Sequence, residues 1–255
     1  MKTKWSLRVV MAVCVMLSLR GNAADESEKI TYDLALRLGG ESGKDTVDKK
    51  EISSWRDGLI GVEGRLGLKP SPLYLELNGY IDGISERGTF YGGDANGRDL
   101  DYTGSGIRMK LEADVGLRIG NSDISLTPFV GLGVRSTRWG DPDPNFLHIE
   151  SWTGYYCALG FRFDAKIDKA KLFARCAIQP SLKETVSIEG EDADLDKKTT
   201  VMGDAELGIV IGHFRISAFG ELFRYDSDRA TAIDRTASSE QIKIATFGGT
   251  IGVNF

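Results

Sequence analysis

Apolar and polar residues alternate along most of the chain from residue 30 to the C-terminus. A period of two is typical of a β-strand with one apolar face, and no stretch beyond residue 29 shows the competing period of a helix. We therefore predict an all-β fold built from ten strands. The alternating segments cover residues 30–38, 60–68, 73–82, 107–119, 124–135, 153–163, 172–182, 201–211, 214–222 and 247–255.

The connections between these segments are of two kinds. Brief turns near Pro70, Asn121, Lys166 and Gly212 alternate with long polar segments. In an up-and-down meander, all long connections then lie at one end and all tight turns at the other, which is typical of a transmembrane antiparallel β-barrel. We predict ten strands, with eight as the alternative count. The long polar segments are residues 41–54, 84–104, 136–150, 183–200 and 226–241.

The size of the apolar face distinguishes a membrane barrel from a soluble one. Ten strands with about five apolar side chains each supply on the order of 50 apolar side chains. The packed interior of an eight-stranded soluble barrel holds only about twelve side chains. The apolar face is thus too large to point inward. Turned outward it forms a belt facing lipid, and strands of about ten residues have the length needed to cross it.

The opposite face of the strands carries charges of both signs and is predicted to line the lumen. Nine cations face nine carboxylates, and unpaired buried charges would cost several kcal/mol. We therefore expect the two sets to neutralise each other and close the lumen; a narrow selective channel is the alternative. The cations are Arg37, Arg65, Arg108, Lys110, Arg118, Arg135, Arg162, Arg175 and Arg215, and the carboxylates are Asp33, Glu63, Glu76, Asp82, Glu112, Asp114, Asp204, Glu206 and Glu221.

The N-terminus has the pattern of a secretory signal. Basic residues precede an apolar run at residues 9–19, and the small residues Gly21 and Ala23 follow it. We expect residues 1–23 to be cleaved and residues 24–255 to form the barrel. The 255-residue chain has a formal net charge of -5, so nucleic-acid binding is not expected.

The closing segment, residues 245–255, resembles the terminal strand of Gram-negative outer-membrane proteins. It ends in Phe255, with Val253, Ile251 and Phe247 at alternate positions before it. The resemblance implies an outer-membrane location, with lipid and lipopolysaccharide as surroundings. It also implies that these four residues are the signal that the barrel-assembly machinery reads. Residues 127–135 resemble a strand of many small outer-membrane barrels.

A ten-stranded barrel is also similar to the omptins, which are outer-membrane proteases. That resemblance implies an aspartate pair facing an Asp-x-His pair at the outer rim. Asp99 and Asp101 match the first pair, but neither His148 nor His213 follows an aspartate at the required spacing. A lipid-cleaving site would need Ser151 near His148, although the alternation places Ser151 outward. We expect no catalysis, with a rim hydrolase acting on peptide or lipid as an alternative.

Oxygen-rich side chains gather in the segment that contains Asp94, Asn96, Asp99 and Asp101. Such ligands suit Ca²⁺, but the spacing is not that of an EF-hand, so these residues are only weak metal candidates and no cofactor is expected.

Cys157 and Cys176 lie on consecutive predicted strands. One register places them opposite each other, close enough for a disulfide, and a register shifted by two makes them diagonal neighbours. The function expected from all these features is a structural or surface-interaction role.

Overall fold

The computed structural model describes residues 30–47, 49–68, 72–91, 97–139, 149–188, 191–194, 199–227 and 240–255. Almost all of them lie in strands. These are β1 (Ile30–Val47), β2 (Lys50–Leu68), β3 (Leu73–Phe90), β4 (Leu100–Leu117), β5 (Ile119–Gly120), β6 (Ile124–Trp139), β7 (Ile149–Ile167), β8 (Ala170–Ile188), β9 (Glu191–Asp194), β10 (Thr199–Ile211), β11 (Phe214–Ser227) and β12 (Glu240–Asn254). The predicted signal, residues 1–23, lies outside the described residues.

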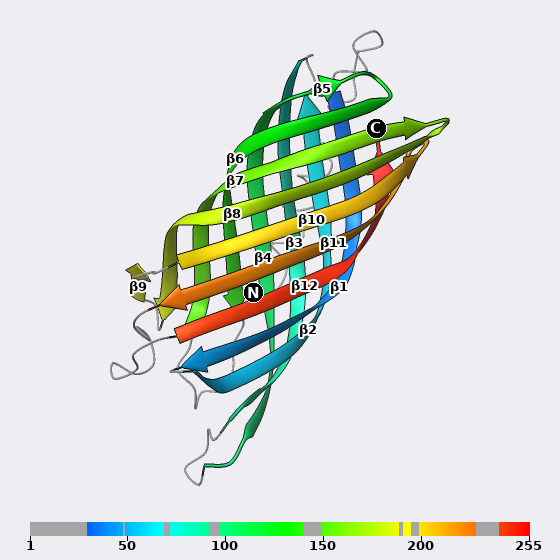
Figure 1. The fold of residues 1–255 in the computed structure, drawn as a ribbon. Coiled ribbons are helices and arrows are strands. Elements are labelled where there is room, and N and C mark those ends of the chain that lie inside the picture. The colour runs from blue at the N-terminus through cyan, green and yellow to red at the C-terminus, as the bar shows by residue number, and fades with distance from the viewer. Residues whose placement is uncertain are drawn as a thin grey trace.

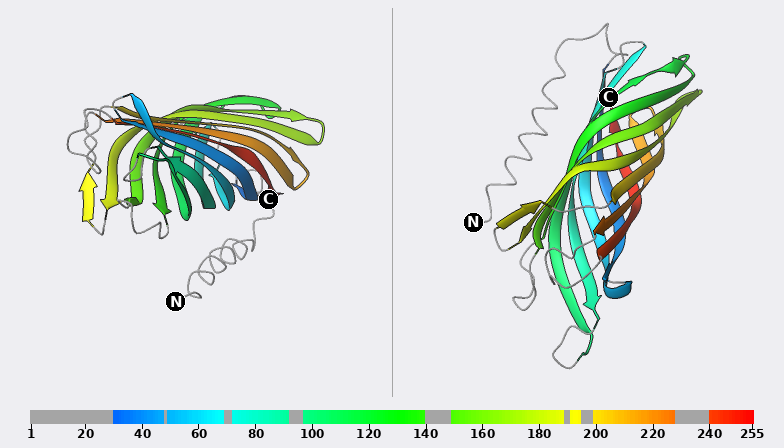
Figure 2. Two further views of the ribbon diagram at one scale, coloured as in Figure 1. Left: turned by 90° about the horizontal axis from the view of Figure 1, so that it is seen from below. Right: turned by 60° about the vertical axis from the view of Figure 1, so that its left-hand side comes forward.

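Ten long antiparallel strands form a closed barrel, as Figures 1 and 2 show. Each pairs with the next, and β12 pairs with β1 to close the cylinder. A path that follows paired residues once around the barrel from Ile30 returns to β1 at Ser42, twelve residues further along. Such a stagger inclines the strands to the barrel axis by about 35–45°. The predicted fold class is confirmed.

The two ends of the barrel differ as the sequence predicted, with one exception. The turn end carries the short connections β2–β3, β4–β6, β7–β8 and β10–β11, and the loop end, at lower left in Figure 1, carries the longer ones. The exception is residues 41–54, predicted as a long loop: β1 continues to Val47 and β2 already begins at Lys50. The long strands contain 13 to 19 residues rather than about ten. Backbone pairing continues past the point where the alternation of apolar residues stops.

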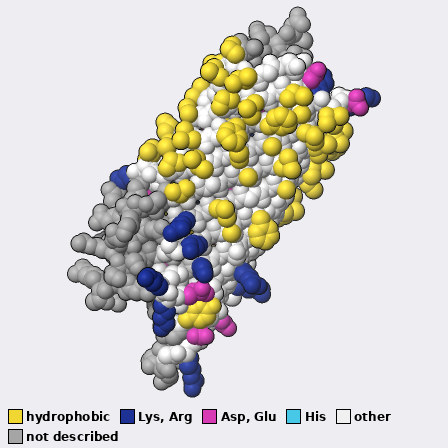
Figure 3. Space-filling view, in the orientation of Figure 1, with side chains coloured by type: hydrophobic (Ala, Val, Ile, Leu, Met, Phe, Trp, Pro, Cys, Tyr) yellow, Lys and Arg dark blue, Asp and Glu magenta, His cyan; other side chains and the backbone are white. Residues whose placement is uncertain are grey.

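Apolar side chains form a belt on the outer surface. On the face that Figure 3 shows, this belt extends from near the turn end to beyond the middle of the barrel. Large apolar side chains at alternate positions are exposed on all ten long strands; examples are Leu36, Ile60, Leu132, Leu207 and Ile251. Exposed apolar surface of this extent is stable only in contact with lipid. Within the described residues, no helix has the length and apolar character needed to cross a membrane.

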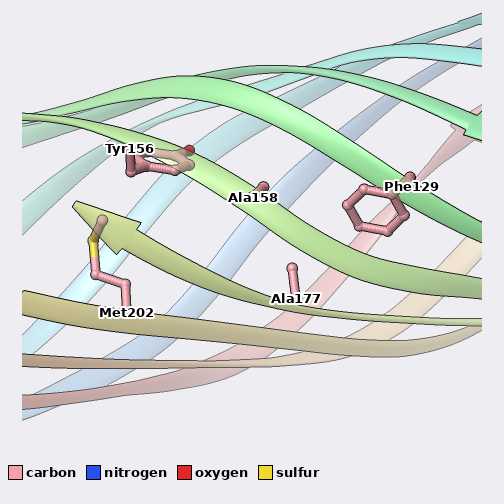
Figure 4. Close-up of a cluster of buried hydrophobic side chains, with 5 residues drawn as sticks. All are labelled: Phe129, Tyr156, Ala158, Ala177 and Met202. Carbon is pink, nitrogen blue, oxygen red and sulfur yellow. The ribbon is translucent and has the colours of Figure 1, made fainter. Parts of the chain in front are cut away.

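Part of the interior is apolar as well. Figure 4 shows the inner face of β6, β7, β8 and β10, where Phe129, Tyr156, Ala158, Ala177 and Met202 form a buried cluster. A second, smaller cluster joins three other strands: Leu59, Ile84 and Phe219. These groups were not predicted, because the alternation had assigned only charged side chains to the inner face.

Neither register considered for the two cysteines is formed, and they make no disulfide. Cys157 and Cys176 are both free, because the β7–β8 turn pairs Ile167 with Ala170 and thereby places Phe161 opposite Cys176. The register differs by four residues from the one that pairs the cysteines. That offset corresponds to about 13 Å along the strand, too far for a bond between them.

This register predicts a crosslink. Phe161→Cys is expected to form a disulfide with Cys176 under mild oxidation, whereas the unaltered chain keeps both thiols reduced. Mass spectrometry of non-reduced tryptic peptides measures the difference. A Cys157–Cys176 bond in the unaltered chain would contradict the register.

Candidate functional site

The lumen contains a network of ion pairs, and Arg37 on β1 is one of its centres. Its guanidinium donates to Glu63 at 3.0 Å, Asp82 at 3.1 Å and Glu221 at 3.0 Å. The carbon of the guanidinium lies 4.0 and 3.9 Å from the ring centroids of Tyr80 and Phe219, which is cation–π geometry. Arg37 is only 3% exposed. One cation thus joins β1 to β2, β3 and β11.

A second centre is built around Arg175 on β8. It pairs with Asp204 at 2.5 Å, with Asp114 at 3.0 Å and with Glu112. Lys110 contacts Asp204 at 2.6 Å and Glu112 at 3.5 Å. These bonds connect β4 with β8 and β10, which are not its neighbours in the sheet, so they span the interior.

A third group joins β2, β10 and β11. Glu63 accepts from Arg65 at 2.8 Å and from Arg215 at 2.9 Å, and both arginines also pair with Glu206. Because Glu63 also accepts from Arg37, this group is continuous with the first centre. Charge-assisted hydrogen bonds of this kind offset the cost of burying charges when the geometry is good.

The remaining pairs lie towards the two ends. Near the turn end, Arg162 contacts Glu76 at 2.9 Å and Asp164 at 3.0 Å. Towards the loop end, Arg108 pairs with Glu41. Arg135 pairs with Glu221.

The structure brings all but two of the eighteen predicted lumen residues into ion pairs. Asp33 instead accepts from the amide of Asn254, and Arg118 lies at the turn end, where it donates to the carbonyl of Asn121 at 3.3 Å. The prediction that Arg118 faces the lumen is wrong, because β4 ends at Leu117, one residue before Arg118.

Sequence reasoning also missed buried lumen carboxylates. They occupy the same alternating positions as the predicted set, but lie in segments that were assigned to loops or left beyond the strand ends. Extending the alternation four residues beyond Arg37 finds Glu41. The missed carboxylates are Glu41, Asp45, Asp57, Asp164 and Glu184.

Between the ion pairs and the loop end lies a cavity of about 1320 Å³. Large side chains line it, including Trp55, Tyr102 and Phe223. The Trp55 ring lies against Gly43, its cross-strand partner, where any β-carbon would collide with it. Nearby, burial raises the pKa of the Asp45 carboxyl to about 6.

The structure describes only part of the predicted rim site. Asp101 is exposed at the loop end of β4 and accepts a hydrogen bond from Thr89 at 2.9 Å, and Asp99 is exposed two residues earlier. His148, Asp94 and Asn96 lie outside the described residues. His213 is at the opposite, turn end, with its ring nitrogen 2.9 Å from the carbonyl of Asn254. Among the described residues no group of side chains is arranged to hold a metal ion.

Three residues of the predicted assembly signal, Phe247, Ile251 and Val253, lie on the outer face of β12, and Phe255 directly follows that strand. Phe247 and Ile251 are exposed in the apolar belt. Phe255 exchanges two backbone hydrogen bonds with Tyr32, of 3.0 and 2.8 Å, so the last residue joins the closing seam of the barrel. Their recognition during assembly stays a prediction.

Comparison of the sequence with models of protein families finds no match. Comparison with curated proteins finds none either. Among solved structures, the outer membrane protease OmpT from Escherichia coli is similar with a TM-score of 0.55 and 8% identity, covering 92% of this chain and 99% of that one. The translocator domain of the autotransporter NalP from Neisseria meningitidis has a TM-score of 0.47 and 12% identity, covering 95% and 96%.

At such identities the likeness to OmpT shows the fold alone. It agrees with the closed ten-stranded register and with the apolar belt, both of which follow from this chain's own residues. The protein is therefore an outer-membrane β-barrel whose described lumen is crossed by ion pairs.

Proposed function

We propose that this barrel is closed to solutes and serves as a structural or surface-interaction protein of the outer membrane, without catalysis. The observation that carries the proposal is the set of ion pairs between strands that are not neighbours, such as Arg37 with Glu221 and Lys110 with Asp204. Because these side chains meet across the interior, they occupy the path that a solute would follow.

Three features support closure rather than a narrow channel. Each cationic centre is held by two or more carboxylates, so opening a path breaks several charge-assisted bonds together. Aromatic rings pack on the guanidinium groups of Arg37 and Arg175 and fill space beside them. Barrels that leave an aqueous channel generally have 16 to 18 strands, far more than this one.

Single-channel recording tests this function. The purified chain in planar bilayers is expected to give no steady ohmic current, whereas a variant with Arg37, Arg135 and Glu221 all replaced by serine is expected to conduct, because three connected side chains leave the lumen. Lys166→Ser, at an exposed turn-end position, is the matched control and should resemble the unaltered protein. Steady conductance in the unaltered protein would refute closure and favour the channel.

A further inference from the structure

Five basic side chains form a row on the outer surface at the loop end. They are exposed, point outward by the alternation of their strands, and occupy five consecutive strands of the barrel. In Figure 3, Lys and Arg side chains gather between the apolar belt and this end. We call them the basic row: Arg224 on β11, Lys243 on β12, Lys44 on β1, Arg56 on β2 and Arg87 on β3.

The registers place like charges opposite each other in this row. Lys243 is paired with Arg224 on one side and with Lys44 on the other, and Arg56 is paired with Arg87. Like charges directly opposite each other destabilise a sheet. Lys44 is also 3.4 Å from Glu51, an exposed pair.

The lumen shows how opposed like charges are accommodated in this sheet. There the registers place Asp82 opposite Arg108 but also Lys110 opposite Arg135. Each cation of this second pair binds a carboxylate from another strand: Lys110 contacts Asp204, and Arg135 contacts Glu221. On the inner face, opposed like charges are thus compensated by ions of the other sign. The outer arrangement favours an external anion that lies between the cations.

The basic row lies just beyond the apolar belt. Arg224 follows the exposed Leu222 by two residues, Arg56 lies four residues from Ile60, and Lys44 lies six residues from Leu38. With about 3.3 Å per residue and inclined strands, the row is about 5–15 Å beyond the belt. That is the depth of lipid headgroups. The outward positions between belt and row carry only small side chains: Gly40, Ser42, Gly58, Gly83, Ser85 and Ala245.

The turn end has no comparable row among its described residues. Its exposed charges are of both signs and include Lys166 and Lys169 together with Asp123 and Asp168. The basic row is therefore a feature of these five strands at the loop end, where the exposed carboxylates Glu51 and Asp101 lie beside it.

We propose that the basic row binds the phosphate groups of anionic lipid headgroups in the leaflet at the loop end. Arginine matches phosphate with a bidentate fork, and lysine adds charge near an anionic surface. Five adjacent strands extend over about 20 Å, so the row suits a headgroup with more than one phosphate.

Lipid binding to the full-length chain in neutral detergent tests this proposal. The probes are lipid A with two phosphates, the same lipid with its phosphates removed, and inorganic pyrophosphate. We expect the diphosphorylated lipid to bind, and Lys44→Gln/Arg224→Gln/Lys243→Gln to weaken that binding on the order of a hundredfold at low salt. The matched control, Lys166→Gln/Lys169→Gln, should bind as the unaltered protein does.

A thermal melt without lipid separates lost binding from lost folding. Because the triple substitution removes like-charge repulsion, this variant should unfold at the same temperature as the unaltered protein or higher. Equal binding of lipid A by the triple variant and the control variant would overturn the proposal. So would equal binding of the dephosphorylated lipid, and displacement by pyrophosphate at lipid-like concentrations would indicate a free-anion site instead.

Discussion

Replacing Arg37 with methionine is expected to lower the free energy of unfolding by about 3–5 kcal/mol, since breaking a buried ion pair leaves its partner charged and uncompensated. Methionine retains much of the packing against Tyr80 and Phe219 but removes every bond to the three carboxylates. Urea unfolding of the protein in lipid vesicles measures the loss. Lys44→Met, which removes the exposed pair with Glu51, is the control and should cost at most about 1 kcal/mol.

A double-mutant cycle adds a sharper test. The Asp82 carboxylate accepts a hydrogen bond from the guanidinium of Arg37. Asp82→Asn in the Arg37→Met background should therefore cost less than it does in the unaltered chain, because a buried negative charge that has lost its cation is removed. Strict additivity of the two substitutions would contradict the assigned pair.

Replacing Leu132 with arginine is expected to destabilise the folded barrel by about 2–4 kcal/mol, the cost of a cation on the lipid face at the middle of a bilayer. Leu132 is 65% exposed and lies halfway along β6. The same substitution at Leu126, also exposed but two residues from the start of β6 at the turn end, should cost about 0–1 kcal/mol. The two variants share strand, residue type and substitution and differ only in depth.

Unfolding titrations in vesicles of defined thickness measure both variants. A loss of unfolding free energy that is large at Leu132 and small at Leu126 supports the placement of the belt within the bilayer. Equal losses at the two positions would mean that the two side chains do not lie at different depths in the lipid. A stabilising effect at Leu132 would refute the membrane assignment altogether.

The alternation of residues was enough to predict which side chains face inward. Arg37, Glu63 and Glu221 were assigned to the lumen from their positions alone, because side chains of a strand point to opposite faces in turn. Their actual partners were not predictable. Arg37 meets Glu221 from a strand far away in sequence, and only the stagger of the closed barrel brings the two to one height.

Strand ends were predicted less well than strand centres. The alternation of apolar residues follows the thickness of the lipid, whereas backbone pairing depends on hydrogen bonds and continues beyond it. Residues 41–54 were therefore assigned to a loop, and Glu41, Asp45 and the outward Lys44 were overlooked. The register of the two cysteines was left open between two alternatives, and neither is formed. A two-residue turn after Ile167 sets the register, and the hydrophobic pattern does not locate that turn.

The fold class, the outward direction of the apolar side chains and the inward direction of the charged ones follow from the amino-acid pattern alone, because they depend on a period of two that is local to each strand. Three features instead required the folded barrel: which charges meet, the position of Trp55 against Gly43, and the five neighbouring cations on the outer rim. Those contacts depend on register and stagger, which arise from turn geometry and from the closure of ten strands into one cylinder.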